Sequence, residues 1–353
     1  MAQKASLSQP DIQPIVEHPT AQQIVTVVGG SGFLGFYVVR ALARRGYRVR
    51  LAVRRPNLAM QMMPLGGVGQ VVAVQTNVRD RDSLEKAVRG SHAVINLVGI
   101  LREKGKQTFQ ALHADGARLL AEVTPPTARL IHVSALGASE NSESAYARSK
   151  AAGEAAMQAA RKDVIIFRPS VLFGTADGFF NRLGAISRLL PVMPVLMPKT
   201  RVQPVFAGDV AEAIAYAVDG KVEAGRIYEL GGPAVVTMKD VSEDVLTIVE
   251  RKKKLFPLSA RLASFSAFWI ELIDKLSLGL VFPPELVFTR DQIALLKTDN
   301  VVSEEAGAEE RTLKGIGLEP TAYDGVIPAY LERFRRAGEF EAMRERRNIA
   351  RKS

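Results

Sequence analysis

The sequence predicts an α/β protein with a doubly wound parallel sheet and a small, mostly helical carboxy-terminal region. Apolar segments typical of buried strands alternate with segments of helical period through residues 24–133, a pattern typical of parallel sheets. A glycine-rich turn joins the first strand to the first helix. The chain has 353 residues, 47% of them hydrophobic, which is enough for one large α/β domain with an appendage.

The first strand, turn and helix form half of a βαβ unit. Residues 24–28 suit a strand covered on both faces, and apolar residues recur at helical spacing after Gly35. The turn fits both the G-x-G-x-x-G and the G-x-x-G-x-x-G patterns, whose glycines allow a tight turn, close approach of a pyrophosphate and close packing of helix on strand. The helix N-terminus offers unpaired N–H groups to phosphates. We therefore expect a dinucleotide site that involves Gly29, Ser31, Gly32, Phe33, Leu34 and Gly35.

The second strand, residues 48–53, ends at two arginines, Arg54 and Arg55. In an NAD site this strand usually ends in an acidic residue that holds the ribose 2′-hydroxyl, whereas an NADP site has arginine there for the 2′-phosphate. The sequence therefore favours NADP(H) over NAD(H), with both arginines as candidate ligands. Arginines that only solvate the surface after a strand are the alternative.

The rest of the first half of the chain continues the alternation of expected strands and helices. Asp80 is expected to cap the helix that follows the third strand, and a capped amphipathic helix is expected to begin at Thr237. Ligands of such a sheet bind beyond the carboxyl ends of its strands, where Asn77 and Gly99 lie. Further strands are expected at residues 71–76, 93–98 and 129–133, and helices at residues 80–89, 107–123 and 237–250.

The composition excludes several kinds of site. The chain has no cysteine, so disulfides, thiolate metal ligands and a cysteine nucleophile are impossible, which fits a reducing compartment. Its histidines show no metal-ligand spacing, so we expect no metal site and interpret them as ordinary surface or core residues. They are His18, His92, His113 and His132.

The two ends of the chain and its charge suggest where it acts. Residues 1–22 are polar and lack the apolar core of a secretory signal, so a flexible tail is expected. No apolar run approaches the ~18 residues that span a bilayer. The formal charge is +10, with basic clusters at 251–254 and in the expected tail 337–353. Without interleaved aromatic residues we do not expect nucleic acid, and an anionic membrane surface or an acidic protein neighbour is favoured over a merely solvated basic face.

Tyr146 and Lys150 are the candidate chemical groups. Four residues apart on a helix, they share a face. An ammonium near a phenol favours phenolate and lowers the phenol pKa, so Tyr146 is expected to act as acid or base near neutral pH. The same lysine could hold a ribose hydroxyl. Ordinary packing of a tyrosine and a lysine on one helix face is the alternative.

Several motifs in order resemble the extended and atypical short-chain dehydrogenase/reductase superfamily. They are residues 29–35 (GGSGFLG), 96–99 (NLVG), Tyr146 with Lys150, 168–174 (RPSVLFG) and 205–211 (VFAGDVA). The resemblance implies a Rossmann domain at 23–235 and a substrate or partner-docking region at 236–336. It also implies cofactor contacts from the glycine turn, Tyr146 and Lys150. Further implied contacts come from Arg54, Asn77, Val78 at the adenine, Val98, Gly99, and Pro169 and Val171 at the nicotinamide.

A narrower resemblance covers residues 24–334. The motifs RLAVRRP, VINLVGIL, DGFFNR, YELGGP and DNVVS are similar to those of the dehydrogenase-like accessory subunits of respiratory complex I and their bacterial relatives. This implies a tightly held NADP(H) that supports structure and assembly, with subunits of the NADH:ubiquinone oxidoreductase as partners. It also implies a cytoplasmic location, peripheral at the inner face of the membrane.

One departure concerns catalysis. Active superfamily members place Ser or Thr about thirteen residues before the tyrosine to polarise a carbonyl; here Ala135 stands at that position and Ser134 one place earlier. Loss of such a donor costs about 10²–10³-fold in rate. Whether the chain is an enzyme therefore stays open. The alternatives are a reductase, epimerase or dehydratase of quinone- or lipid-related substrates with Ser134, Tyr146 and Lys150 as catalytic residues, and a redox sensor.

Beyond residue 235 the motifs of the superfamily fade. After the basic run at 251–254, an apolar stripe is expected on a helix, where it would lie in a membrane interface, pack on a membrane-bound subunit, or line a substrate cleft. The stripe consists of Phe265, Phe268, Trp269, Leu272 and Ile273.

Overall fold

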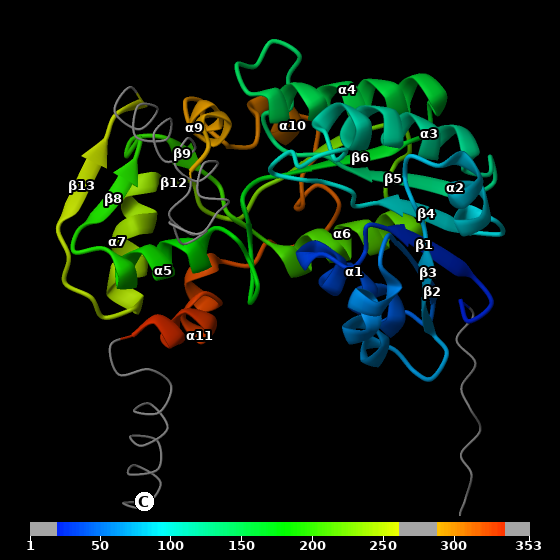
Figure 1. The fold of residues 1–353 in the computed structure, drawn as a ribbon, viewed down its shortest axis with the longest axis horizontal. Coiled ribbons are helices and arrows are strands. Elements are labelled where there is room, and N and C mark those ends of the chain that lie inside the picture. The colour runs from blue at the N-terminus through cyan, green and yellow to red at the C-terminus, as the bar shows by residue number, and fades with distance from the viewer. Residues whose placement is uncertain (1–19, 261–287, 336–353) are drawn as a thin grey trace, which may run out of the picture.

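The protein is described by a computed structural model, which covers residues 20–260 and 288–335. Its centre is a seven-stranded sheet in the order β11-β6-β5-β4-β1-β2-β3 (Figure 1). Every pair in this sheet is parallel, and the order reverses direction between β1 and β4, as in a doubly wound Rossmann sheet. The strands are β1 (Ile24–Val28), β2 (Arg48–Val53), β3 (Val71–Gln75), β4 (Ala93–Asn96), β5 (Arg129–Val133), β6 (Ile165–Pro169) and β11 (Ile227–Leu230).

Helices cover both faces of this sheet (Figure 1). On one face lie α1 (Phe33–Arg44) and α6 (Ala207–Val218). On the other lie α2 (Arg81–Val88), α3 (Gly116–Val123) and α4 (Ala145–Ala160). Because the central strands β1 and β4 are covered on both sides, they are mostly apolar along their length rather than alternating.

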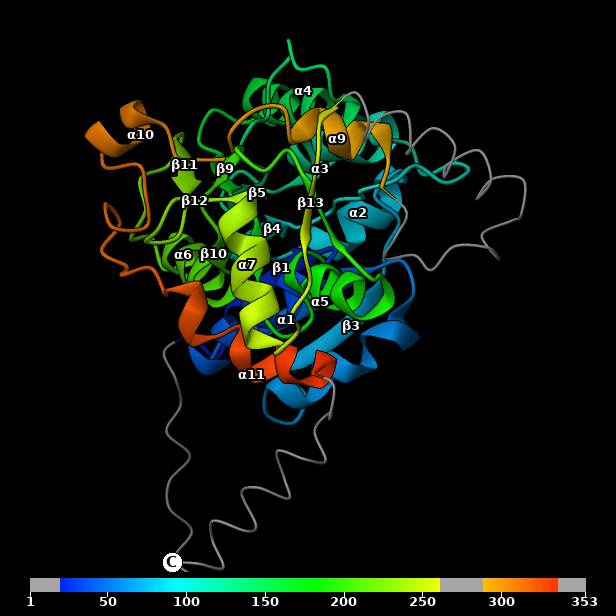
Figure 2. The ribbon, with the colours of Figure 1, turned by 90° about the vertical axis from the view of Figure 1, so that its left-hand side faces the viewer.

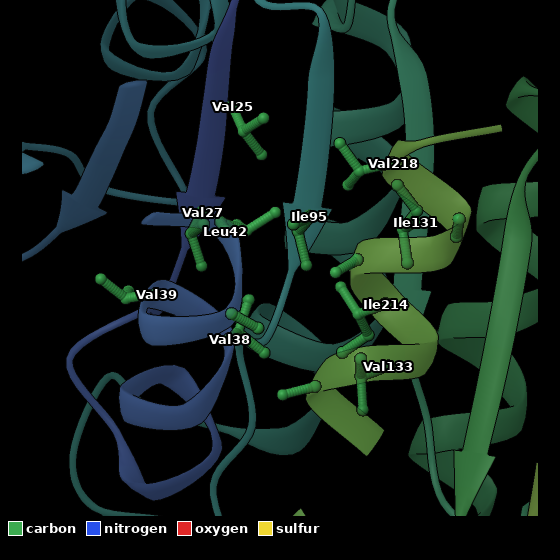
Figure 3. Close-up of a cluster of buried hydrophobic side chains, with 14 of the residues drawn as sticks. Val25, Val27, Val38, Val39, Leu42, Ile95, Ile131, Val133, Ile214 and Val218 are labelled. Carbon is green, nitrogen blue, oxygen red and sulfur yellow. The ribbon is translucent and has the colours of Figure 1, made fainter. Parts of the chain in front are cut away.

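The core between α1, α6 and the sheet is made of branched aliphatic side chains (Figure 3). Each such side chain, when fully buried, contributes about 1.5–3 kcal/mol. This packing fixes the carboxyl ends of β1 and β4, where the glycine turn begins. The side chains labelled in the figure are Val25, Val27, Val38, Val39, Leu42, Ile95, Ile131, Val133, Ile214 and Val218.

A second, smaller core lies beside the sheet (Figures 1 and 2). It joins α5 (Phe180–Leu189), α7 (Met238–Ile248) and α11 (Pro328–Leu331) through buried side chains such as Phe180 and Val241. The parallel pair β8 (Met193–Leu196) and β13 (Leu255–Leu258) lies against it.

Short elements connect these parts. Two more small sheets pair β7 with β10 and β9 with β12. The remaining elements are η1 (Pro56–Leu65), η2 (Gln110–Asp115), β7 (Leu172–Phe173), β9 (Arg201–Val202), β10 (Val205–Phe206), β12 (Val236–Thr237), α9 (Arg290–Leu295), α10 (Glu304–Ala308), η4 (Tyr323–Gly325) and η5 (Glu332–Phe334).

Most sequence expectations for these elements are confirmed. The first, second and fifth strands have the expected bounds, while β3 and β4 end one and two residues early. Asp80 caps α2 by accepting from Ser83 N at 3.2 Å, and Thr237 and Asp240 form a capping box on α7. The helix expected at 107–123 is instead a π-helical turn, η2, followed by α3.

Some expectations lie outside the described residues. They concern residues 1–19 of the amino-terminal tail, the apolar stripe at 265–273 and the basic tail 337–353. Within residues 20–260 and 288–335, no helix has both the length and the apolar character needed to cross a bilayer. Part of the basic run 251–254 is tied into the fold, because Arg251 Nε donates to Phe334 O at 2.9 Å.

Candidate dinucleotide site

The glycine turn has the geometry that a dinucleotide fold requires. Gly29 has φ +80°, a conformation that suits glycine, and a Cβ there would lie 3.0 Å from Val98 N. At Gly35 a Cβ would lie only 2.1 Å from Gly30 O, so this glycine lets α1 pack on the turn. These two glycines are therefore needed by the protein itself.

Gly32 differs from its neighbours. It is the N-cap residue of α1, and a Cβ there would meet nothing closer than Gly29 O at 3.8 Å in the described part of the chain. The protein thus has room for a side chain at Gly32, and the open space above it fits a pyrophosphate. The first turn of α1 carries no acidic residue, so its N–H groups and dipole favour a bound phosphate.

A pocket of about 770 Å³ opens at the carboxyl ends of β2 and β3, beside α2. Arg54 and Asn77, two of the expected cofactor contacts, lie in its wall, whereas Arg55 is the exposed N-cap residue of η1 and is not among the lining residues described. The sequence reasoning missed Lys86, because its position in this wall depends on how α2 packs. The wall consists of Arg50, Arg54, Val74, Gln75, Thr76, Asn77, Asp80, Asp82, Ser83, Lys86 and Ala87.

The loop after β4 joins the glycine turn to α4. Val98 lies against Gly29, and a Cβ on Gly99 would lie 3.7 Å from Lys150 Nζ and 3.9 Å from His113 Nε2. Val78 lies next to Gly116 of α3, within the core on that face of the sheet. Four of the expected contact residues, Gly29 of the turn, Val98 and Gly99 of this loop and Lys150 of α4, thus lie near one another.

Pro169 and Val171 lie at the end of β6. Pro169 O accepts from Leu136 N at 3.0 Å, and Val171 O accepts from Val205 N at 2.9 Å. These bonds fix the turn where the nicotinamide contact is expected. Ser170 between them is held by Asn300, whose side-chain oxygen accepts from Ser170 Oγ at 2.6 Å.

Tyr146 and Lys150 both lie on α4, as predicted. The Tyr146 ring is half-buried and meets the edges of two rings, with centroid distances of 6.0 Å to Phe109 and 5.7 Å to His113. Lys150 is 5% exposed, and its ammonium donates to Val133 O at 3.0 Å. The pair shares one helix face, but the ammonium is directed at the backbone of β5.

The predicted effect on the phenol is wrong. Burial and the nearby Asp291 carboxylate raise the pKa of Tyr146 to about 12, because both disfavour a phenolate. Burial also lowers the pKa of Lys150 to about 8, and the charge of Glu154 opposes part of that change. Near neutral pH, Tyr146 is therefore a phenol that donates a proton or a hydrogen bond, and not a base.

Ser134 and Ala135 have different surroundings. Ser134 is 4% exposed, and its Oγ has no hydrogen-bond partner among the described residues, whereas Ala135 is half-buried. Both residues follow the end of β5, and the backbone there is fixed because Ser134 N donates to Phe167 O at 2.7 Å.

Two histidines that the sequence reasoning took as ordinary residues belong to the polar surroundings of Lys150. His113 Nε2 accepts from Ile100 N at 3.0 Å, and its Nδ1 lies 2.8 Å from Ser149 Oγ. Burial, together with the charge of Lys150, lowers the pKa of His113 to about 3. His113 lies in the π-helical turn η2, and such turns are frequent at functional sites.

His132 is the second of these histidines. Its Nδ1 lies 3.1 Å from Asn96 Nδ2, so Nδ1 accepts and the ring proton is assigned to Nε2. That Nε2 is buried and has no partner among residues 20–260 and 288–335. Burial lowers the pKa of His132 well below its usual value. No local sequence signal marks either histidine, because both act through contacts between distant elements.

The fold and this edge define an NAD(P)-binding protein of the reductase and epimerase class. The sequence profile of the family described as NAD dependent epimerase/dehydratase matches residues 25–231, and the chain belongs to that family. The residues present fit a dinucleotide, because the space at Gly32, the free N-terminus of α1 and the pocket at Arg54 lie along one edge of the sheet. Within the described ranges, no group of three or more His, Asp or Glu residues is placed to hold a metal.

Two curated relatives differ in what their names say. NADH dehydrogenase (ubiquinone) 1 alpha subcomplex subunit 9, mitochondrial, of Arabidopsis thaliana is 34% identical over 325 residues, 89% of this chain and 79% of that protein. Ceramide reductase of Caulobacter vibrioides is 35% identical over 231 residues, 65% of this chain and 68% of that protein.

A solved structure shares the fold. The NADPH-dependent quinone oxidoreductase QOR2 of Escherichia coli, crystallised with NADPH, has a TM-score of 0.66 and 16% identity, and the match covers 87% of this chain and 99% of that one. The similarity supports the Rossmann architecture, and the predicted fold class is confirmed.

Proposed function

We propose that the chain is an NADP(H)-binding accessory subunit of the membrane-associated NADH:ubiquinone oxidoreductase, in which the bound cofactor is mainly structural. The observation that carries this proposal is the 34% identity to the alpha subcomplex subunit 9 protein over 89% of the chain. The site supports it as well. Space for a dinucleotide is kept, while Ala135 replaces the expected hydroxyl and Tyr146 is held as a phenol.

The same proposal assigns the cofactor contacts. The glycine turn, with Ser31, Phe33 and Leu34, binds the pyrophosphate, and Tyr146 and Lys150 hydrogen-bond the ribose on the nicotinamide side. NADP(H) is preferred over NAD(H), which is supported by two cations of the pocket wall, Arg54 and Lys86, and by the absence of an acidic residue at the end of β2. The further contacts are Arg55, Asn77, Val78, Val98, Gly99, Pro169 and Val171.

In this proposal the chain works in the cytoplasm, peripherally at the inner face of the membrane. Residues 23–235 bind the dinucleotide and residues 236–336 dock on subunits of the complex. The formal charge of +10 and the exposed Lys252 and Lys254 support contact with an acidic partner or an anionic membrane surface. A cofactor bound only by the folded state stabilises it by mass action, which suits a structural role.

The test is to solubilise native membranes of the source cell gently, separate the complexes, and identify the nucleotide extracted with this chain. Co-migration with NADH:quinone oxidoreductase activity and stoichiometric NADP(H) is expected. Recovery of the chain as a free protein, with a readily exchanged nucleotide or none, would overturn the proposal.

A reductase, epimerase or dehydratase acting on a hydrophobic, quinone- or lipid-related substrate is the second candidate. It is favoured by the 35% identity to a ceramide reductase and by the presence of Tyr146 and Lys150 on α4. A bound nicotinamide would supply hydride, and the Tyr146 hydroxyl would give its proton to the substrate oxygen. Tyr146→Phe should then abolish NADPH oxidation with quinone or keto-lipid substrates while NADPH affinity stays nearly intact. If the wild-type protein oxidises no NADPH with either class, this candidate fails.

A further inference from the structure

The helix that carries Tyr146 and Lys150 is held at its N-terminus by a residue from the far end of the chain. Asp291, in the first turn of α9, accepts hydrogen bonds from Ala145 N at 2.6 Å, Ser144 Oγ at 2.9 Å and Tyr146 N at 3.3 Å. The first N–H groups of a helix have no partner within the helix. Asp291 satisfies those of Ala145 and Tyr146, while Ser144 caps Ala147 N at 3.2 Å.

Asp291 is itself fixed by its surroundings. It belongs to residues 288–303, which we call the strap. The helix α9 begins with a capping box between Thr289 and Gln292, and Ile293 is 1% exposed. Lys297 Nζ pairs with Glu143 Oε2 at 2.6 Å, immediately before α4. The carboxylate of Asp291 is therefore held in place before any ligand binds.

The strap also reaches the ends of two strands that border the site. Asn300 Oδ1 accepts from Ser170 Oγ at 2.6 Å, after β6, and Asn300 Nδ2 donates to Leu136 O at 3.3 Å, after β5. The same short segment thus contacts α4, the end of β5 and the end of β6. A displacement of the strap would move three of the elements on which the dinucleotide site is built.

The charge of Asp291 matters as well as its hydrogen bonds. A helix N-terminus carries a positive partial charge that, like the ammonium of Lys150, favours a phenolate at Tyr146. The negative charge of Asp291 opposes this effect, because the Asp291 carboxylate lies against the backbone of Tyr146. The charged or titratable groups that face Tyr146 are Asp291 from α9, Lys150 from α4 and His113 from η2.

We propose that Asp291 is a positioning residue of the dinucleotide site, which fixes the first turn of α4, and Tyr146 with it, against the strap. The inference rests on the proposed binding of NADP(H) at this site. It explains how a residue 145 positions away from Tyr146 in the sequence contributes to the position and the electrostatic surroundings of Tyr146.

The experiment compares Asp291→Asn with a matched control from the same strap, Asp299→Asn. Asp299 also accepts from a backbone N–H and a guanidinium, both of Arg201 at 2.8 Å, but it is exposed and makes no contact with α4 among its described bonds. The Asn side chain keeps the shape of Asp and loses its charge and one acceptor. Both variants thus remove a hydrogen-bonded carboxylate from the strap, and only Asp291→Asn removes one that contacts α4.

Two readouts separate positioning from mere stability. The first is the titration of Tyr146, followed by fluorine NMR of protein labelled with 3-fluorotyrosine, in which the Tyr146 signal is the one lost in Tyr146→Phe. The second is the dissociation constant of NADPH. In Asp291→Asn we expect the Tyr146 midpoint to fall by about one pH unit or more and the NADPH dissociation constant to rise about tenfold. In Asp299→Asn the Tyr146 midpoint should stay at its wild-type value, and the NADPH dissociation constant should stay within about twofold of the wild type.

Asp291→Glu, which keeps the carboxylate, should restore most of both readouts, and it also serves if Asp291→Asn does not fold. A Tyr146 midpoint unchanged in Asp291→Asn, or equally changed in Asp299→Asn, would overturn the inference, as would an Asp291→Glu variant whose two readouts depart from the wild type as far as those of Asp291→Asn. The titration is made without cofactor. If the wild-type protein binds no dinucleotide, the proposed function fails while the titration still decides the role of Asp291.

Discussion

At the scale of single residues, Lys150 is the most consequential charge of the site. It is 5% exposed, and its environment consists of a backbone carbonyl, His113 and the buried carboxylate of Glu154. Glu154 is in turn held by Arg168, with bonds of 2.9 Å and 2.6 Å. A buried cation with one direct acceptor is costly to keep charged. The cost should be visible in how stability depends on pH.

We predict that Lys150 makes the fold more stable as pH rises from about 8 to 10. Burial lowers its pKa to about 8, so across this window the unfolded chain holds a proton that the folded chain has released. The free energy of unfolding is therefore lowered below pH 8, where the folded chain must keep Lys150 charged, and it increases above pH 8, where Lys150 is neutral in the folded chain. Relative to Lys150→Met, the wild-type free energy of unfolding in urea should rise by about 1.4 kcal/mol per pH unit. A difference that does not change with pH would contradict this, and Lys252→Met, at an exposed position, is the control.

A second prediction at this scale concerns Arg54. Arg54 lines the pocket at the ends of β2 and β3, and the adjacent Arg55 does not. A charge-assisted hydrogen bond to a phosphate contributes about 1.5–3 kcal/mol. Arg54→Ala should therefore weaken NADPH binding at least about tenfold and leave NADH binding nearly unchanged, as measured by calorimetry.

Arg55→Ala is the matched control for this measurement, since it removes the same charge one residue away. It should change the NADPH dissociation constant less than Arg54→Ala does, and Lys86→Ala should resemble Arg54→Ala. Equal effects of Arg54→Ala and Arg55→Ala would show that the 2′-phosphate is bound by general positive charge and not in the pocket.

At the scale of elements, two glycines of the same turn are expected to have different tasks, Gly35 in folding and Gly32 in binding the dinucleotide. Gly35 is required by the backbone of Gly30, whereas Gly32 has room for a side chain in the absence of ligand. Gly35→Ala should thus destabilise the protein strongly or prevent its folding. Gly32→Ala should leave thermal unfolding without cofactor unchanged and weaken NADPH binding at least about tenfold, because the methyl group occupies the space for the pyrophosphate. Loss of stability in Gly32→Ala without cofactor would contradict this assignment.

The helix α4 is the second element that joins separate parts. Its N-terminus is held by Asp291 from the strap, its middle carries Lys150 against β5, and Glu154 reaches Arg168 of β6. Arg168 NH1 also lies 3.7 Å from Glu229 of β11. Polar contacts between α4, the strap, β5, β6 and β11 therefore help to fix the edge of the sheet where we propose that the dinucleotide binds.

At the scale of the whole molecule, a dinucleotide bound only by the folded state must stabilise the fold. At a concentration one hundred times the dissociation constant, NADPH should add about 2.7 kcal/mol to the free energy of unfolding. The added stability should grow with the logarithm of NADPH concentration in urea titrations. No added stability at saturating NADPH would show that the folded chain does not bind it, and would remove the basis for a structural cofactor.

The fold itself was largely predictable from the sequence. Strands β1, β2 and β5 have the expected bounds because each is a short segment rich in apolar residues, several of them β-branched, as expected of strands in a covered parallel sheet. Asp80 and Thr237 were recognisable as caps because capping depends on residues three positions apart. The helix predicted at 107–123 was only partly right, because helical period does not reveal the π-helical turn at His113.

By itself, the sequence determined the parallel sheet, the glycine turn and the spacing of Tyr146 and Lys150, all of which depend on residues close together in the chain. Only the tertiary structure decided the direction in which the pKa of Tyr146 is shifted, the burial of Lys150 and the positions of Lys86, His113 and Asp291. The physical reason is that pKa values and hydrogen bonds depend on burial and on partners from distant elements. Asp291 next to Tyr146 is such a partner, and no local pattern in the sequence records it.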